Sequence, residues 1–222
     1  MASTNWSYVG LALALVGPGA IALASKRLTN GTLSPSADLL WLVVFITLVF
    51  TVAAIGILGE KLKCAEIGLG RISIYSMPSA IALAAFFIFV FGPAANWALR
   101  KTGVGSFDHG TSWLAALPVW YLCLTVIVVA AGEEWLYRGY AIERLQVVTG
   151  DAWLAGTISL LAFTIAHLPV WGLGASLTTL VSGGIMTILY IWSRDISFLI
   201  VAHVITDLYG LVITPIVGRL PH

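Results

Sequence analysis

Charge is scarce in this sequence. Only 9% of its 222 residues are Asp, Glu, Lys or Arg, whereas about a quarter are charged in a typical soluble domain. Hydrophobic residues make up 59%, and the mean hydropathy is +0.99. This composition excludes an ordinary soluble domain and indicates an integral membrane protein, with the lipid bilayer as its first partner. The net charge of +1 gives no basis for binding nucleic acid.

Cysteine is also scarce. Cys64 and Cys123 are far apart, and each lies in or beside an apolar stretch, so neither a disulfide framework nor a cysteine-based metal site is indicated. The segment "MASTNW" before the first apolar run has no positive charge, so we expect that run to remain as a membrane helix. The ending "GRLPH" is not a lipidation motif.

Long apolar runs, by contrast, are abundant. A membrane helix needs about 20 mostly apolar residues, and the candidate spans are 7–25, 37–58, 75–98, 112–131, 152–168, 175–193 and 196–217. Pro78 and Pro93 make the ends of the third span uncertain and leave room for an eighth, short segment. The stretch 59–74 mixes charged with apolar residues and is predicted to lie at the interface as an amphipathic helix.

The loops between these runs are short, and no internal repeat is evident. Because the edges of an open sheet would stay unpaired in lipid, the sequence predicts one all-α membrane domain over 1–222. Its architecture is a polytopic transmembrane bundle of about seven or eight helices. With the N-terminus outside, the inner loops would carry five Lys or Arg and the outer loops six. The orientation therefore stays open.

Several ionisable side chains fall inside or directly beside apolar runs. They are Glu133, Glu134, Arg138, His167, His203 and Asp207. Each ionisable residue at membrane depth costs roughly 2.5–3.5 kcal/mol on insertion scales. We therefore expect these side chains to face the interior of the bundle and to contact one another.

The spacing of these residues suggests partners. Glu134 and Arg138 are four residues apart and can pair on one helix face, whereas Glu133 points about 100° away. His203 and Asp207 have the same spacing. Phe163 and His167 are also four residues apart, which places an aromatic ring one turn from the imidazole.

If these helices converge, a carboxylate and two imidazoles share a partly dry cavity. Such a carboxylate can act as a general base on water, and nearby hydrogen-bond donors can stabilise a tetrahedral oxyanion. A carboxylate, two imidazoles and such donors together can hydrolyse a peptide bond. No nucleophile elbow, phosphate loop or "HEXXH" motif competes with it. "SGG" at 182–184 indicates close helix packing rather than a serine nucleophile.

Three motifs together carry a resemblance to a known family. They read "EEWLYR" at 133–138, "FTIAH" at 163–167 and "HVITD" at 203–207. In order and spacing the chain resembles the CAAX-protease and bacteriocin-processing family of membrane proteins, which includes the type II CAAX prenyl endopeptidases. The approach "YIWSRDISFLIVAH" is also similar. The resemblance covers a core of about 112–210, and "EIGLGR" at 66–71 is loosely family-like.

This resemblance implies a glutamate-dependent intramembrane protease with about eight helices and with neither metal nor cofactor. By analogy, Glu133 and His167 activate water, and His203 and Asp207 form the oxyanion side. Glu134 and Arg138 would support Glu133, with Phe163 as the remaining motif residue.

An asparagine at position 207 could donate a hydrogen bond to an oxyanion, whereas an ionised aspartate cannot. Asp207 therefore either orients His203 or stays protonated.

The resemblance implies a peptide or a prenylated CAAX-type protein as the substrate. The compact length of the chain is typical of a prokaryotic protein, so we expect the plasma membrane as its location.

Other interpretations stay open at this stage. "EEWLYR" could be an interfacial charge cluster with Trp135, Tyr137 and Tyr140 as an aromatic belt. The chain could also be a non-catalytic scaffold of the same fold, acting in immunity or signalling, or a metal-dependent hydrolase or ion pathway built on the same Glu and His residues. Four further charged residues are predicted to be solvated: Glu143, Arg144, Arg194 and Asp195.

Overall fold

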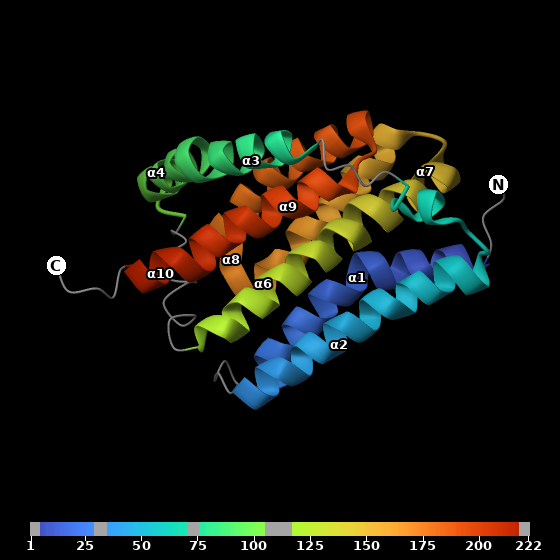
Figure 1. Cartoon of the computed structure of the whole chain (residues 1–222), viewed down its shortest axis with the longest axis horizontal. Helices are drawn as coiled ribbons and strands as arrows, with labels where there is room; N and C mark the ends of the chain where they lie inside the picture. Colours follow the sequence, from blue (N-terminus) through green and yellow to red (C-terminus); the bar gives the residue numbers. More distant parts are fainter. Residues whose placement is uncertain (1–4, 29–34, 71–75, 105–116, 218–222) are drawn as a thin grey trace.

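The computed structural model describes residues 5–28, 35–70, 76–104 and 117–217. In these ranges the regular elements are helices, which pack as one bundle (Figure 1). In chain order they are α1 (Asn5–Leu28), α2 (Pro35–Ala54), η1 (Ile55–Gly59), η2 (Cys64–Ile67), α3 (Met77–Phe86), η4 (Phe87–Phe91), α4 (Gly92–Thr102), α6 (Val119–Glu133), η6 (Glu134–Ala141), α7 (Ile142–Thr149), α8 (Ala152–Ser193), α9 (Ile196–Asp207), η7 (Leu208–Ile213) and α10 (Thr214–Val217).

Six continuous helical stretches among these residues are long and apolar enough to cross a membrane. They are Asn5–Leu28, Asp38–Gly59, Met77–Thr102, Val119–Thr149, Ala152–Ser193 and Ile196–Val217. The prediction of an all-α polytopic membrane bundle is confirmed.

The fifth stretch, α8, reverses direction at Gly172. This residue has φ 76° and ψ −178°, a conformation that only glycine adopts without strain. The residues on either side pack against each other, because a Cβ on Gly156 would lie 2.9 Å from Thr187 and one on Gly183 would lie 3.2 Å from Leu160. Helix α8 is therefore an antiparallel hairpin of two arms, 152–171 and 173–193. The predicted spans 152–168 and 175–193 correspond to these arms.

Three predicted boundaries differ from the structure. Residues 77–102 form one unbroken stretch. Pro78 occupies the first turn of this stretch, where proline costs little, and Pro93 follows the π-helical η4. The expected interfacial helix over 59–74 is wrong within the described part, which has only the short 3₁₀ turn η2; residues 71–75 lie outside it. The span expected to end at 131 continues as helix to Thr149.

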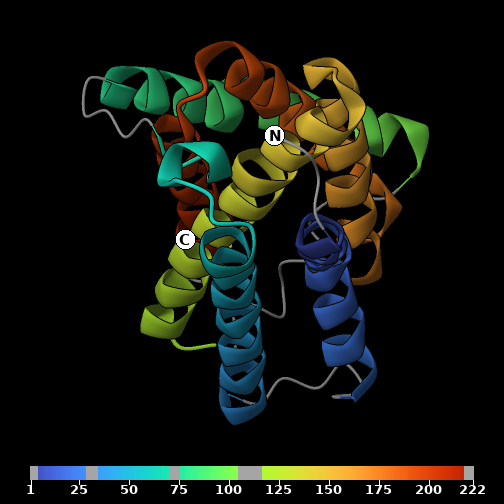
Figure 2. The same ribbon diagram turned by 90° about the vertical axis from the view of Figure 1, so that its right-hand side faces the viewer.

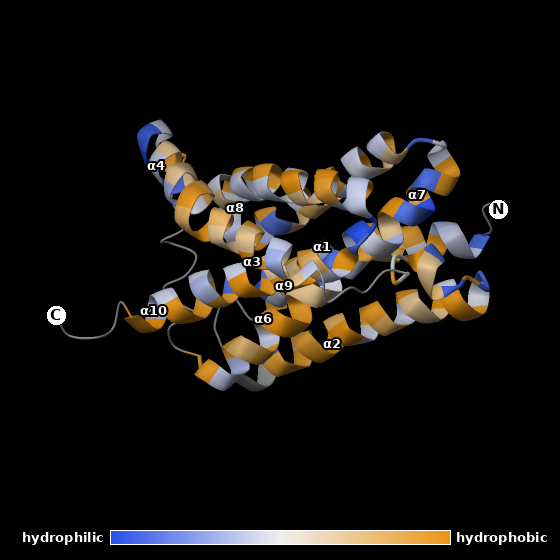
Figure 3. Cartoon of the chain, turned by 45° about the horizontal axis from the view of Figure 1, so that its top comes forward, coloured by the Kyte–Doolittle hydropathy of each residue, from blue (hydrophilic) through white to orange (hydrophobic). Residues whose placement is uncertain are grey.

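The outer faces of the bundle are apolar. Large hydrophobic side chains such as Phe50, Leu58 and Trp192 are 70%, 75% and 71% exposed. Figure 3 shows apolar residues running along the length of α2. Exposed apolar surface of this extent fits lipid rather than water.

The centre of the bundle is formed by η6, in which every residue from Glu134 to Ala141 is buried. Helices α1 and α2 lie side by side in both views (Figures 1 and 2), and α1 also packs on α8. Helix α9 contacts α3, α6 and η6. The motif-bearing segments of α6, α8 and α9 thus meet in the interior.

Candidate active site

The first motif lies in the middle of a helix rather than at its end. Glu133 is the last residue of α6, and Glu134 begins the π-helical η6, which continues into α7. Trp135, Tyr137 and Tyr140 are at most 6% exposed. The interpretation of "EEWLYR" as an interfacial charge cluster with an aromatic belt is therefore wrong.

Glu134 and Arg138 form a buried ion pair, as their spacing predicts. The Nη1 of Arg138 lies 3.0 Å from Oε1 of Glu134, and the two side chains are 1% and 0% exposed. The guanidinium also donates to the carbonyl of Gly183 at 3.4 Å and lies 4.1 Å from the ring centroid of Phe163. Contacts on three sides fix its position, and Arg138 in turn fixes Glu134.

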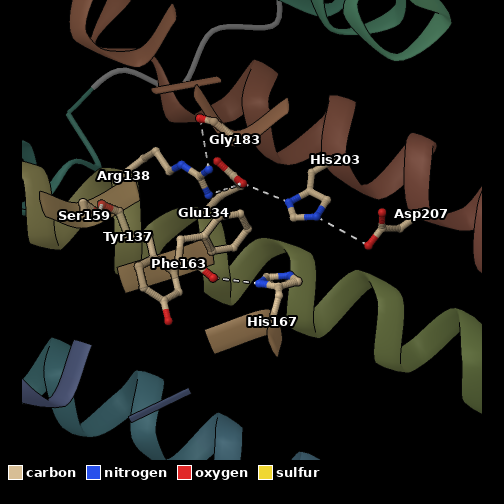
Figure 4. Close-up of polar contacts among 9 residues, drawn as sticks. All are labelled: Glu134, Tyr137, Arg138, Ser159, Phe163, His167, Gly183, His203 and Asp207. Atoms are coloured by element: carbon tan, nitrogen blue, oxygen red, sulfur yellow. Dashed lines mark hydrogen bonds and ion pairs between the residues drawn. The ribbon is translucent and has the colours of Figure 1, made fainter. Parts of the chain in front are cut away.

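His203, on α9, lies between two carboxylates (Figure 4). Its Nδ1 is 2.9 Å from Oε1 of Glu134, and its Nε2 is 3.4 Å from Oδ2 of Asp207. The pairing of His203 with Asp207 is as predicted, whereas the contact with Glu134 joins α9 to η6. Because a carboxylate only accepts hydrogen bonds, an imidazole that donates from both nitrogens satisfies both contacts.

His167, in the first arm of α8, is oriented by its own helix. Its Nδ1 lies 2.8 Å from the carbonyl oxygen of Phe163, and the two rings meet edge to face at 4.5 Å. Since a carbonyl oxygen accepts only, Nδ1 carries the proton and Nε2 of the neutral ring keeps its lone pair. The aromatic ring predicted one turn from the imidazole is present.

Glu133 differs from Glu134 in its surroundings. It is half-buried, and within the described ranges its carboxylate accepts no hydrogen bond. It lies within electrostatic range of the imidazoles of His167 and His203 and of the carboxylate of Asp207. The structure therefore brings together the candidate residues from three separate helical segments.

Tyr137, which contacts Phe163, and Ser159, which binds Tyr137, were not predicted as part of the site. The carbonyl of Tyr137 accepts from Ser159 Oγ at 2.6 Å, and its ring packs on Phe163 at 5.0 Å. The only available signal for Tyr137 was its position four residues after Glu133. The predicted close packing at 182–184 is confirmed, because Gly183 lies against Arg138.

A second polar cluster, named here the Glu60 cluster, joins Ser7, Glu60, Tyr140 and Arg144. Glu60 accepts from Ser7 Oγ and from Tyr140 at 2.7 Å, and Arg144 lies 3.7 Å from it. The predicted solvation of Arg144 is wrong, since this residue is 6% exposed.

Asp195 is likewise buried, at 7%, where it accepts from Ser197 and Ser76. Of the four charged residues predicted to be solvated, only Arg194 and Glu143 are partly exposed. Nη1 of Arg194 lies 2.6 Å from Oε1 of Glu143.

An apolar groove of about 370 Å³ lies beside the site, between α2 and α6. Its lining residues are Ile46, Val49, Phe50, Val128, Ala131, Gly132 and Trp135. Ala131 and Gly132 immediately precede Glu133 in the chain, so the groove adjoins the motif. Over the described ranges, no group of three or more His, Cys, Asp or Glu side chains is arranged to hold a metal ion.

One comparison with known proteins, the scan against protein families, gives a match, and it agrees with the three motifs. Neither the curated proteins nor the solved structures give a match. The family model described as type II CAAX prenyl endopeptidase Rce1-like matches residues 115–209. This segment includes every motif residue described above and all of α6, η6, α7 and α8. Residues 115–209 are thus similar to the Rce1-like family of type II CAAX prenyl endopeptidases, as the three motifs predict.

Proposed function

We propose that this membrane protein is a glutamate-dependent intramembrane endopeptidase in which Glu133 and His167 activate a water molecule. The observation that carries the proposal is the contrast between the paired glutamates. Glu134 is fully buried and bound by Arg138 and His203, whereas the carboxylate of Glu133 accepts no hydrogen bond within the described ranges and lies within electrostatic range of two imidazoles. Oε2 of Glu134 is also without a hydrogen-bond partner in the described part of the chain, but the ion pair with Arg138 stabilises the charged form of this carboxylate and makes Glu134 the weaker base of the two.

The proposed reaction begins when water attacks the carbonyl carbon of the peptide bond. Glu133 accepts the proton of the water, and Nε2 of His167 orients it through its lone pair. The carbonyl oxygen becomes an oxyanion beside His203, whose ring Asp207 orients at 3.4 Å. Glu133 then passes the proton to the leaving nitrogen as the carbon–nitrogen bond breaks.

Glu134 and Arg138 support this reaction without contacting the peptide. The ion pair at 3.0 Å is isolated from solvent, and Oε1 of Glu134 also holds His203. This network sets the position of His203 relative to Glu133. Such buried charge pairs are costly to break from one side, so the network stays intact during turnover.

For the substrate, we propose a peptide that carries an apolar chain, such as a prenylated C-terminal peptide. The apolar groove between α2 and α6 is lined by Gly132 and Trp135, the residues that flank Glu133 and Glu134 in the chain, and offers a surface on which such a chain can lie. The family description, a type II CAAX prenyl endopeptidase, names the same chemistry for its members.

The test is cleavage of a farnesylated CAAX peptide by the purified protein in detergent, with the unprenylated peptide in parallel. Wild type should cleave, and Glu133→Gln and His167→Ala should lose about 10²–10⁴-fold in kcat/KM. Glu143→Gln, which alters a carboxylate paired with Arg194, is the matched control and should retain activity. Equal cleavage by wild type and Glu133→Gln would reject the mechanism.

Two further arms separate the alternatives. A chelator should leave cleavage unchanged, whereas loss of activity and its recovery with zinc would support the metal-dependent hydrolase. A scaffold would cleave neither peptide and would keep its partner binding in Glu133→Gln. Equal cleavage of prenylated and unprenylated peptides would show that the apolar chain is not recognised.

A further inference from the structure

Two polar groups one turn apart on one helix lack a hydrogen-bond partner among the residues that the structure describes. The hydroxyl of Tyr137 is buried and has none within the described part of the chain. The carboxylate of Glu133, four residues earlier, accepts none there either. One group is a donor and the other an acceptor, and their four-residue spacing is the one that brings the side chains of Glu134 and Arg138 into contact.

The position of the Tyr137 ring, and therefore of its hydroxyl, is fixed by packing. It packs edge to face on Phe163 at 5.0 Å, and Ser159 binds the carbonyl of the same residue at 2.6 Å. Figure 4 shows the hydroxyl pointing away from the network of Glu134, Arg138 and His203. It therefore has no role in that network and needs another partner.

Buried hydroxyl groups in folded proteins nearly always have a partner, frequently an ordered water. A buried water typically makes two to four hydrogen bonds to otherwise unsatisfied polar groups. Tyr137 and Glu133 offer one donor and one acceptor at such a position, and the imidazole of His167 lies within electrostatic range of Glu133.

We propose that the hydroxyl of Tyr137 donates a hydrogen bond to one bound water, which in turn donates to the carboxylate of Glu133. Tyr137 is then a positioning residue that acts through Glu133 and keeps its carboxylate facing the two imidazoles. The proposal rests on the proposed function for its kinetic consequence, whereas the bound water itself does not depend on it.

The kinetic test compares Tyr137→Phe with Tyr140→Phe. Both tyrosines lie in η6 and are 0% exposed, but the hydroxyl of Tyr140 donates to Glu60 in the Glu60 cluster. Tyr137→Phe should lower kcat about 10- to 100-fold, the value of a hydrogen bond to a charged group, with KM and Tm unchanged. Tyr140→Phe should lower Tm and leave kcat unchanged.

A merely structural role would instead lower the Tm of Tyr137→Phe and leave the kcat of the folded fraction at the wild-type value, which would overturn the proposal.

The second test is a high-resolution structure of the wild-type protein in lipid. A water within about 3.2 Å of both the Tyr137 hydroxyl and a Glu133 oxygen supports the proposal. A site with no water, or with a water that contacts only one of them, overturns it. Failure of wild type to cleave any peptide would reject the proposed function, and the water density would still decide the role of Tyr137.

Discussion

At the scale of single residues, two adjacent glutamates have opposite surroundings. Glu134 is in the core, and its Oε1 contacts both Arg138 and His203. Glu133 is half-buried and lies within electrostatic range of the imidazole of His167. A rotation of about 100° along the helix is enough to place neighbouring side chains in different environments. The two carboxylates therefore suit different tasks.

Gly183 sets how closely Arg138 can approach the second arm of α8. A Cβ at this position would lie 2.9 Å from Nη2 of Arg138, whereas one on Gly184 would lie 3.6 Å from its nearest neighbour. Gly183→Ala should displace the guanidinium and with it Glu134, and so lower kcat/KM for peptide cleavage about 10- to 100-fold.

Gly184→Ala is the matched control for this prediction and should behave as wild type in the same cleavage assay. Comparable activity in the two alanine variants would mean that the approach of Arg138 to Gly183 does not govern catalysis.

The residue pairs that the sequence predicts are those set by helical spacing. Glu134 with Arg138, His203 with Asp207, and Phe163 with His167 are each four residues apart. The packing of Tyr137 and the burial of Arg144 could not be predicted, because each depends on residues far away in the chain. Ser159 is 22 residues from Tyr137, and Glu66 is 78 residues from Arg144.

At the scale of elements, the π-helical η6 is anchored by a loop from the first half of the chain. Trp135 Nε1 donates to the carbonyl of Ile67 at 2.9 Å, and Arg144 donates to that of Glu66 at 3.0 Å. Gly68 packs directly on the backbone of Gly139. The stretch "EIGLGR", which looked only loosely family-like, thus contacts the segment that carries the first motif.

Gly68→Ala should loosen this contact. Its φ is +80°, and a Cβ would lie 2.3 Å from Cα of Gly139, so both backbone strain and overlap oppose the side chain. We expect a loss of about 2–4 kcal/mol in the free energy of unfolding, measured by unfolding in detergent.

Gly150→Ala provides the control for strain alone, because its φ is +75° and nothing lies within 4 Å of the added Cβ. It should cost about 1 kcal/mol. Equal losses in the two variants would show that the overlap with Gly139 is relieved without cost.

The existence and type of the membrane helices could be predicted from runs of apolar residues, but some of their ends could not. The stretch that begins as α6 continues beyond 131 because Glu134 and Arg138 pair with each other and also contact His203 and Gly183 on other helices. Charge alone does not end a helix. The turn in α8 could not be placed at Gly172 from hydropathy, since apolar residues continue on both sides of it.

At the scale of the whole molecule, the buried part of the protein includes residues outside 115–209, the segment that the family model matches. The Glu60 cluster joins the start of α1 and the end of η1 to η6 and α7. Ser7 and Tyr140 donate to Glu60, whose side chain is 3% exposed and lies 3.7 Å from Arg144. The first two membrane helices are thereby fixed to the motif-bearing part of the bundle.

Glu60→Ala should therefore destabilise the protein strongly. It leaves the buried guanidinium of Arg144 without its carboxylate, which typically costs about 3–5 kcal/mol in the free energy of unfolding. Thermal unfolding in detergent would measure this loss.

Glu66→Ala removes a carboxylate that caps the backbone N–H of Lys63 at an exposed turn. It should cost only about 1 kcal/mol. If both alanine variants unfold at the same temperature, the Glu60 cluster does not hold the two parts together.

The reversal at Gly172 decides on which sides of the bilayer the two ends of the described chain lie. Six crossings would return the chain to the side from which it began. Because α8 folds back on itself, its two arms count as two crossings, and the total becomes seven when every apolar stretch crosses. An odd number separates Asn5 from Val217 by the whole thickness of the membrane, so the conformation of one glycine sets the sidedness of the molecule.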